Sequence, residues 1–421
     1  MIERINIIGL FSLYNYDICR AEDSKVLILT GPNGFGKTTI LQIINHFCTG
    51  KFWYFIFLPF TKIDIFFSDG IHFCIEKKKS ESEAEKNQPI VISLYDENGA
   101  VLEEEFFDSN YIDYLVRRFR HFSVRYSIQN TEELLEEEYS NHVDDRVRTR
   151  MPKTLEYLQH INCLMIEEQR LMYLSKFRSE PVLVRTVEDI QKVIKQFYSE
   201  AQKVYNLASL KIDGSFVYRL SNMTPDNKGK HIKQERIYRD VVNKIAEFKK
   251  YGLVGELGVV SNLGVHYNQV LKLYLKDLYE KLLSLEPFYQ KLHTFDKLVT
   301  SKELSYKRLL FEHDSMKVVN DNGKEIPIYK LSSGEQNLIV LCYKMVFELD
   351  DRNLLLIDEP EKSLHVAWLE NLLDDYKLIS DSTGCQMIIA THSPSFIHGN
   401  WSITYDLCEN GEIQEFTTSD I

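Results

Sequence analysis

The fold of this chain is decided by one glycine-rich stretch, Gly31-Pro32-Asn33-Gly34-Phe35-Gly36-Lys37-Thr38-Thr39. It follows an apolar run at 26–30 and precedes an apolar-periodic segment at 40–47, so the sequence predicts a strand, a loop and a helix in that order. Glycines let the backbone curl until successive N–H groups point at one phosphate, and the start of the following helix adds partial positive charge there. The pattern predicts a phosphate-binding loop. A glycine-rich turn without a ligand is the weaker alternative, because a strand and a helix flank the stretch.

Roles within this loop follow from the chemistry of each side chain. Lys37 is expected to reach the β- and γ-phosphates of a nucleotide, and Thr38 to place its hydroxyl on Mg²⁺. Lys37 is therefore also a candidate catalytic residue, and Thr38 a candidate metal ligand. The residues expected to bind the nucleotide here are Gly31, Asn33, Gly34, Gly36, Lys37, Thr38 and Thr39.

Length and composition limit the class of protein. The chain has 421 residues, enough for two or three packed units, and its 44% hydrophobic content is ordinary for a globular protein. With a formal net charge of -12, any contact with nucleic acid has to come from a local basic patch. The alternating N-terminus at 1–8 lacks the plan of a signal peptide, and the most apolar window, 52–60, is too short to span a membrane. We therefore expect a cytoplasmic protein.

The apolar patterns predict an α/β chain that is interrupted by helices. The expected strands are 4–8, 26–30, 62–67, 71–76, 90–95, 309–312, 316–319 and 326–329. Three helices of about 15–20 residues are expected, with their apolar faces at 190–204, 237–248 and 271–285, and they are too short for a long coiled-coil arm. These patterns predict a first nucleotide-binding lobe at 1–175, a helical insertion at 176–305 and a second lobe at 306–421.

Two apolar runs in the second lobe end in polar residues suited to catalysis. The run at 353–357 leads into Asp358 and Glu359. Asp358 is expected to hold the Mg²⁺ shell, and Glu359 to accept a proton from an attacking water, although both acids are also common helix caps. The run at 386–390 leads to His392, which is expected to hydrogen-bond the γ-phosphate or to orient the water.

A further motif, Leu331-Ser332-Ser333-Gly334-Glu335-Gln336, precedes a helix-like run. A serine hydroxyl and glycine N–H groups at a helix start form an anion cup, the same device as the phosphate loop. The same residues also form a common capping box, so this motif alone is weak.

The motifs together resemble the head domain of ATP-binding-cassette ATPases, in the branch that includes the structural-maintenance-of-chromosomes, recombination-repair and overcoming-lysogenization-defect proteins. The resemblance covers the two ends of the chain and little of the middle. It places the Walker A motif at Gly31–Thr39, the signature at Leu331–Gln336, Walker B at Leu354–Glu359, the D-loop at Lys362–His365 and the H-loop at His392. It implies an α/β head with a two-lobed mixed sheet that binds ATP and Mg²⁺ and hydrolyses ATP, at a rate that the motifs do not set.

In that family a second subunit completes each site. The resemblance implies that Ser332, Ser333 and Gly334 contact the nucleotide held by another chain, and hence a homodimer of heads. Ser333 in place of glycine and Glu335 in place of glutamine are typical of the non-transporter branch. The family also has a glutamine that touches Mg²⁺. We assign this role to Gln169, which ends a short apolar strand at 163–168, with an ordinary surface glutamine as the alternative.

The sequence leaves two biological roles for the expected ATPase, one in anti-phage defence and one in DNA repair. The segments Ile7–Phe11, Asn15–Ile18 and Ile166–Leu171 resemble the ATPase subunits of Septu-type, retron-associated and PARIS-type anti-phage systems. That resemblance implies a sensor or scaffold that controls a separate effector, such as an HNH or Toprim-like nuclease, in response to DNA or a phage protein. The alternative is a DNA-repair ATPase. The mixed arginines and aromatics of Tyr114–Tyr126 favour it, although they suit an amphipathic helix equally well.

Other functions are disfavoured for this chain. Its seven cysteines form no C-x-x-C pair, so the sequence contains no zinc or redox motif of that kind. The cluster at 141–145 lies in a polar connection and is typical of a solvated loop rather than a metal site. We expect neither a nuclease active site nor a transporter.

Overall fold

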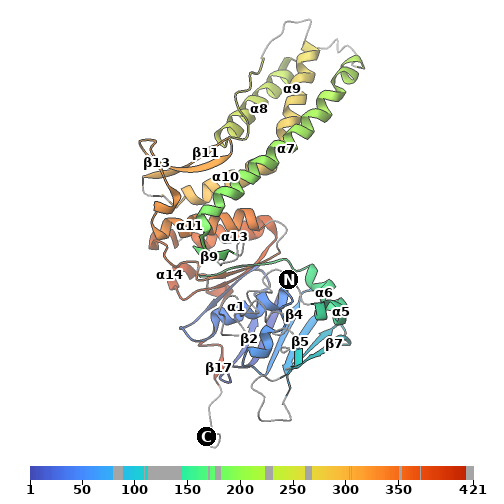
Figure 1. Cartoon of the computed structure of the whole chain (residues 1–421), viewed down its shortest axis with the longest axis vertical. Helices are drawn as coiled ribbons and strands as arrows, with labels where there is room; N and C mark the ends of the chain where they lie inside the picture. The colour runs from blue at the N-terminus through green and yellow to red at the C-terminus, as the bar shows by residue number, and fades with distance from the viewer. Residues whose placement is uncertain are drawn as a thin grey trace, which may run out of the picture. The chain divides into compact units, whose positions relative to one another are not determined.

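The computed structural model describes residues 1–78, 89–108, 110–111, 145–168, 171–175, 182–222, 231–260, 268–302, 304, 306–349, 353–369 and 371–413. The chain divides into two compact units. One consists mainly of Met1–Gln169 and Glu348–Ile421, and we call it the sheet unit. The other lies mainly within 170–347, and we call it the helical unit. Figure 1 labels several of the helices and strands of each unit.

The sheet unit contains a five-stranded parallel sheet with the strand order β16-β3-β15-β14-β8. Its strands are β3 (Val26–Thr30), β8 (Cys163–Ile166), β14 (Leu354–Asp358), β15 (Gln386–Ala390) and β16 (Thr404–Asp406). Every residue of β3, β14 and β15 is buried, which explains why these strands appear in the sequence as continuous apolar runs. Because all neighbours are parallel, their carboxyl ends meet at one edge.

A seven-stranded antiparallel sheet forms the other layer of strands, in the order β17-β2-β1-β4-β5-β6-β7. Its strands are β1 (Ile2–Leu10), β2 (Tyr14–Cys19), β4 (Lys62–Phe67), β5 (His72–Lys77), β6 (Ile90–Tyr95), β7 (Val101–Phe107) and β17 (Glu412–Ile413). The expected strands at 4–8, 62–67, 71–76 and 90–95 are all present. The buried side chain of Gln386 joins the two sheets, because it accepts a hydrogen bond from the N–H of Ile2 (2.8 Å) and donates one to its carbonyl (2.7 Å).

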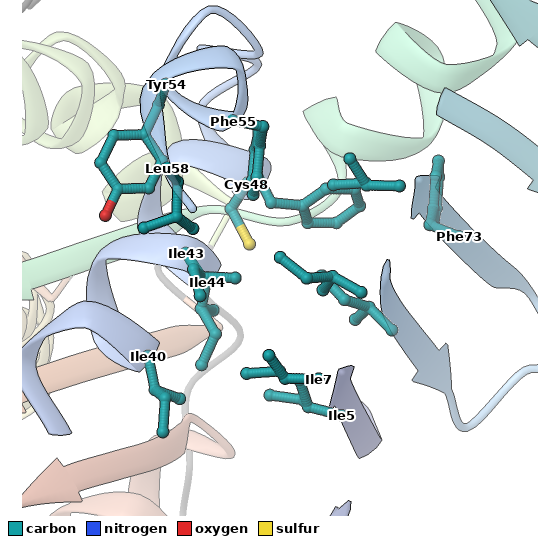
Figure 2. Packing of buried hydrophobic residues seen from close by; sticks show 14 of the residues in the cluster. Ile5, Ile7, Ile40, Ile43, Ile44, Cys48, Tyr54, Phe55, Leu58 and Phe73 are labelled. Atoms are coloured by element: carbon teal, nitrogen blue, oxygen red, sulfur yellow. The ribbon is translucent and has the colours of Figure 1, made fainter. Parts of the chain in front are cut away.

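The core of the sheet unit is built around α1 (Lys37–Cys48), the helix that follows the glycine-rich loop. Figure 2 shows Ile40, Ile43, Ile44 and Cys48 of α1 among buried apolar side chains that include Ile5 and Ile7 of β1. This packing fixes α1, and with it the loop at its start. The other helices of the unit are α2 (Tyr54–Phe57), α5 (Asp145–Arg150), α6 (Pro152–Gln159), α12 (Val366–Leu369), α13 (Leu372–Thr383) and α14 (Pro394–Ile397), with a 3-10 turn at Trp401–Ile403.

The helical unit contains α7 (Thr186–Ser221), α8 (His231–Lys250), α9 (Asn268–Leu283) and α10 (Glu286–Thr300). The expected length of the first helix was wrong, because α7 has 36 residues and is about 54 Å long at 1.5 Å per residue. The apolar pattern that predicts a buried helix face does not continue through all of α7. In its second half, Leu207, Leu210 and Val217 are 68–75% exposed. Ion pairs instead hold this half of α7 to α9, between Arg219 and Asp277 and between Asp213 and Lys281.

The signature segment also belongs to the helical unit. A three-stranded antiparallel sheet of β11 (Lys307–Glu312), β12 (Ser315–Asn320) and β13 (Glu325–Ile326) leads through a 3-10 turn at Ile328–Lys330 into α11 (Ser333–Tyr343). A π-helical turn, Lys344–Glu348, follows, and a short hairpin of β9 (Met172–Ser175) and β10 (Val182–Arg185) completes the unit. The helical unit extends to about residue 347, because α11 packs against α7 and α10, and the lobe boundaries at 175 and 306 stay a prediction. The α/β architecture with inserted helices is confirmed.

Candidate nucleotide site

The candidate site lies at the carboxyl edge of the parallel sheet. β3 leads into the glycine-rich loop, β14 ends at Asp358, and β15 leads to Thr391 and His392. These strands are neighbours in the order β3-β15-β14, so the sheet brings together residues that are more than 300 positions apart in sequence. Ligands of open parallel sheets bind at this edge.

The loop depends on glycine for its backbone. Gly31, Gly34 and Gly36 have φ values of 144°, 91° and 84°, in the region that residues with a Cβ rarely adopt. A Cβ on Gly36 would also lie 3.2 Å from Leu10 Cδ2. The loop is also held by a contact that the sequence did not predict. The buried Tyr16 donates its hydroxyl hydrogen to the Phe35 carbonyl at 2.7 Å.

The start of α1 is suited to an anion. Gly36 is the residue before the helix, no side chain caps the first turn, and no acidic residue lies in it. The N–H groups of the first turn of a helix have no partner within the helix and carry partial positive charge. An α1 of 12 residues that begins at the loop therefore presents donors to a phosphate.

Lys37 lies folded over the loop. Its side chain is buried, and Nζ donates to the carbonyls of Gly31 (2.9 Å) and Pro32 (3.2 Å). These two contacts hold the ammonium group where the loop curls, as a phosphate-binding lysine requires. Of the other predicted nucleotide contacts in the loop, Asn33, Gly34 and Thr38 are exposed, and Gly31, Gly36 and Thr39 are half-buried.

The predicted metal ligands Thr38 and Asp358 meet directly. The Thr38 hydroxyl donates to Asp358 Oδ2 at 2.9 Å. Asp358 is only 2% exposed, and its other oxygen, Oδ1, is buried without a hydrogen-bond partner among the described residues. Burial raises the pKa of Asp358, the charges of Glu359 and Glu361 raise it further, and the Thr38 hydrogen bond and Lys37 act in the opposite direction.

This arrangement fits Mg²⁺. The ion prefers hard oxygen ligands and is commonly held by one or two protein groups together with substrate phosphates and water. A hydroxyl and a buried carboxylate with an unused oxygen supply that set. Within the described residues no cluster of three or more histidine, cysteine or acidic side chains is placed to hold a metal.

Glu359 and His392 also lie together. His392 Nδ1 is 3.2 Å from Glu359 Oε1. Glu359 has a φ of 44°, a strained value for a residue with a side chain, and its N–H donates to the Ala390 carbonyl at 2.9 Å. The backbone is thus bent away from strand geometry at the end of β14, beside the end of β15.

The remaining predicted site residues are Gln169 and the three signature residues. Gln169 lies outside the described residues, although the strand expected before it is present as β8, and Glu168 forms an ion pair with Lys362. Ser332, Ser333 and Gly334 lie at the start of α11 in the helical unit, where both serines are exposed. The capping box is real, because Glu335 Oε2 accepts from the N–H (3.0 Å) and hydroxyl (2.9 Å) of Ser332, and Lys307 binds its other oxygen at 2.6 Å.

The sequence did not point to Glu361. Its buried carboxylate contacts Thr391 and the backbone of His392. The signal was available as a third carboxylate in the run Asp358-Glu359-Pro360-Glu361, close to the two acids that were assigned.

Residues 11–397 match the protein family described as AAA ATPase domain. The chain belongs to this family. The matched segment of this AAA ATPase contains the glycine-rich loop, the signature, Asp358, Glu359 and His392, and the family implies that a nucleotide is the ligand.

Other comparisons give the following results. No curated protein matches the chain. Among solved structures it is similar to an Smc head bound to the C-winged helix domain of ScpA (12% identity, TM-score 0.37, covering 100% of this chain and 98% of the other). It is also similar to a Pyrococcus furiosus Smc head with an extended coiled coil bound to the C-terminal domain of ScpA (13%, 0.36, 100% and 97%) and to the SMC head of Thermotoga maritima (11%, 0.34, 99% and 99%).

Among the described residues, no helix is long and apolar enough to cross a membrane.

Proposed function

We propose that this AAA ATPase binds ATP with Mg²⁺ at the carboxyl edge of its parallel sheet and hydrolyses the nucleotide. The observation that carries the proposal is the Thr38–Asp358 pair beside the glycine-rich loop, with one buried carboxylate oxygen left over for a cation. Bound Mg²⁺ would neutralise phosphate charge. Lys37 would exchange its loop carbonyls for phosphate oxygens, a stronger charge-assisted contact.

Glu359 is proposed as the general base for the attacking water, with His392 as its partner. Gln169 is proposed to complete the Mg²⁺ and water contacts. Ser332, Ser333 and Gly334 are proposed to contact the nucleotide of a second chain, so that two chains enclose each ATP. Closure of such a dimer with ATP, and its release after hydrolysis, would make the chain a switch.

The variant Glu359→Gln tests the assignment, because it keeps the shape of the side chain and removes the base. We expect ATP affinity within about threefold of wild type and a hydrolysis rate lower by at least about 100-fold. Phosphate release and binding of a fluorescent ATP analogue measure the two effects.

The matched control is Lys37→Ala, which removes the phosphate contact and should weaken ATP binding about 100-fold. The substitution Lys211→Ala, at an exposed position of α7, should change neither quantity. A Glu359→Gln variant that hydrolyses ATP at the wild-type rate would show that another group is the base.

We further propose that the switch controls a separate effector, a nuclease, in anti-phage defence. The support is the sequence resemblance of Ile7–Phe11 and Ile166–Leu171 to defence ATPases. Co-expression with the product of a neighbouring nuclease gene should give a stable complex and protection from phage, and Glu359→Gln should change that protection. Strong ATP-dependent DNA binding without such a partner would favour the alternative, a DNA-repair ATPase.

A further inference from the structure

Glu361 connects the two turns that follow β14 and β15. Its Oε1 accepts from the Thr391 hydroxyl (2.5 Å) and from the His392 N–H (3.2 Å). The Thr391 oxygen accepts in turn from the Ser393 N–H at 3.0 Å, so the hydroxyl hydrogen is committed to Glu361. The carboxylate therefore holds the segment that carries His392.

The imidazole of His392 faces two carboxylates. Nδ1 lies 3.2 Å from Glu359 Oε1 and 3.6 Å from Glu361 Oε1. Ionised carboxylates only accept hydrogen bonds, so Nδ1 has to carry the hydrogen. One N–H makes one strong hydrogen bond, and in this structure Glu359 is the nearer acceptor.

Glu361 has an unused acceptor. Its Oε2 is buried and has no hydrogen-bond partner among the described residues. An unsatisfied oxygen of this kind is costly, and a donor that turns toward it is favoured. The carboxylate as a whole can therefore accept one more hydrogen bond, and its Oε1 lies 3.6 Å from His392 Nδ1.

A change of acceptor from Glu359 to Glu361 matters for the base. An oxygen that already accepts the hydrogen of His392 Nδ1 is occupied. While His392 donates to Glu359 Oε1, that oxygen is not free to contact an attacking water.

We propose that Glu361 is a positioning residue for hydrolysis that acts as the second acceptor of the His392 Nδ1 hydrogen. When nucleotide is bound, His392 turns from Glu359 to Glu361, and Glu359 is released to act as the base. The inference rests on the proposed ATP hydrolysis and adds a residue that controls it.

The first test is a double-mutant cycle of Glu361→Gln with His392→Ala. Glutamine keeps an oxygen that can accept from Thr391 but has no charge. We expect Glu361→Gln to leave ATP affinity within about twofold and to lower kcat about tenfold. In the His392→Ala background the same change should alter kcat less than about twofold, because the residue acts through the imidazole. An undiminished effect in that background would overturn the proposal.

Thr391→Val is the matched structural control. It removes a hydrogen bond to Glu361 and leaves the carboxylate in place, so kcat should change less than about threefold even if stability falls. A tenfold loss in this variant would mean that Glu361 acts only through local folding.

The second test does not depend on hydrolysis. Long-range ¹H–¹⁵N NMR of the His392 ring, assigned with His392→Ala, reports the position of the ring hydrogen with and without Mg²⁺ and a non-hydrolysable ATP analogue. We expect an Nδ1-protonated ring in wild type, and a response to the analogue that Glu361→Gln removes. Identical ring spectra in both proteins would overturn the inference, whereas a wild type without ATPase activity would instead contradict the proposed function.

Discussion

Asp358 is a carboxylate in a place where burial disfavours its charge. Its Oδ1 has no partner among the described residues, and Glu359 and Glu361 add like charge. This unfavourable burial of charge destabilises the nucleotide-free protein, because a bound cation would offset it. A residue of this kind lowers stability in return for ligand binding.

We expect Asp358→Asn to stabilise the nucleotide-free protein by about 1 kcal/mol at pH 7. Asparagine can still accept from Thr38 and removes the buried charge. The pKa of Asp358 is raised on folding, so its penalty is fully present above the folded-state pKa and disappears as pH falls toward the unfolded-state value. The difference between the two proteins in urea unfolding should therefore shrink from pH 7 toward pH 4.

The control for this prediction is Asp381→Asn, an exposed position of α13 that should have no such effect. Nucleotide binding in the presence of Mg²⁺ should be weaker in Asp358→Asn than in wild type. Equal or lower stability of Asp358→Asn at pH 7 would mean that burial of the Asp358 carboxylate does not destabilise the protein.

Candidate site residues could be predicted from the sequence where they follow an apolar strand. Residues whose role depends on a hydrogen bond to a distant part of the chain could not. Lys37, Thr38, Asp358, Glu359 and His392 follow buried runs, and parallel pairing brings such ends together. Glu361, Tyr16 and Gln386 act through hydrogen bonds to backbone or side-chain groups elsewhere in the chain. No periodicity marks a residue of that type, and its hydrogen-bond partners become evident only in the folded structure.

At the scale of elements, the end of α8 depends on one glycine. Gly252 follows the helix with a φ of 65°. A Cβ there would lie 2.7 Å from the carbonyl carbon of Glu312 and 3.0 Å from the His313 nitrogen, both backbone atoms of the β11–β12 hairpin. The helix end and the hairpin can approach this closely only because the side chain is absent.

Gly252→Ala should therefore destabilise the protein by about 2 kcal/mol or more, since both the backbone conformation and the close approach are lost. Gly258→Ala is the matched control, because its Cβ would meet no atom within 4 Å and its φ is not in the positive region. Thermal unfolding of the two variants measures the difference. Equal melting temperatures would show that the hairpin moves away without cost.

Prediction of strands succeeded where apolar residues form a run or alternate, and failed where charged residues interrupt them. The fully buried β3, β14 and β15 were predicted from their composition. β7 was missed because its Glu103, Glu104 and Glu105 break the pattern. All three carboxylates have structural partners, since Glu103 accepts from the first N–H groups of α6, Glu104 accepts from the Ser93 hydroxyl, and Glu105 pairs with Arg150.

At the scale of the whole molecule, the phosphate loop and the signature belong to different compact units of one chain. Each chain has one copy of each motif. If two chains enclose each nucleotide, as we propose, every active site combines the loop of one chain with the signature of another.

Mixing two inactive variants tests this arrangement. Lys37→Ala removes the loop function, and Ser333→Arg blocks the exposed start of α11. Each variant alone should be inactive, but an equal mixture should recover about a quarter of wild-type activity, because half of the dimers are mixed and have one intact site of two. A mixture that stays inactive while both variants still dimerise would contradict sharing of sites between chains.

The hydrogen bond between Thr38 and Asp358 spans 320 residues of sequence. At the usual rate of ribosomal synthesis, about 5–20 residues per second, the second partner is made about 15–60 s after the first. During that interval β3 has neither of its neighbours β15 and β16, and the helical unit, which is encoded in between, can fold first. A nascent chain therefore exposes the phosphate loop long before Asp358, Glu359 and His392 have been made, and the proposed site can be completed only when nearly all of the chain has been translated.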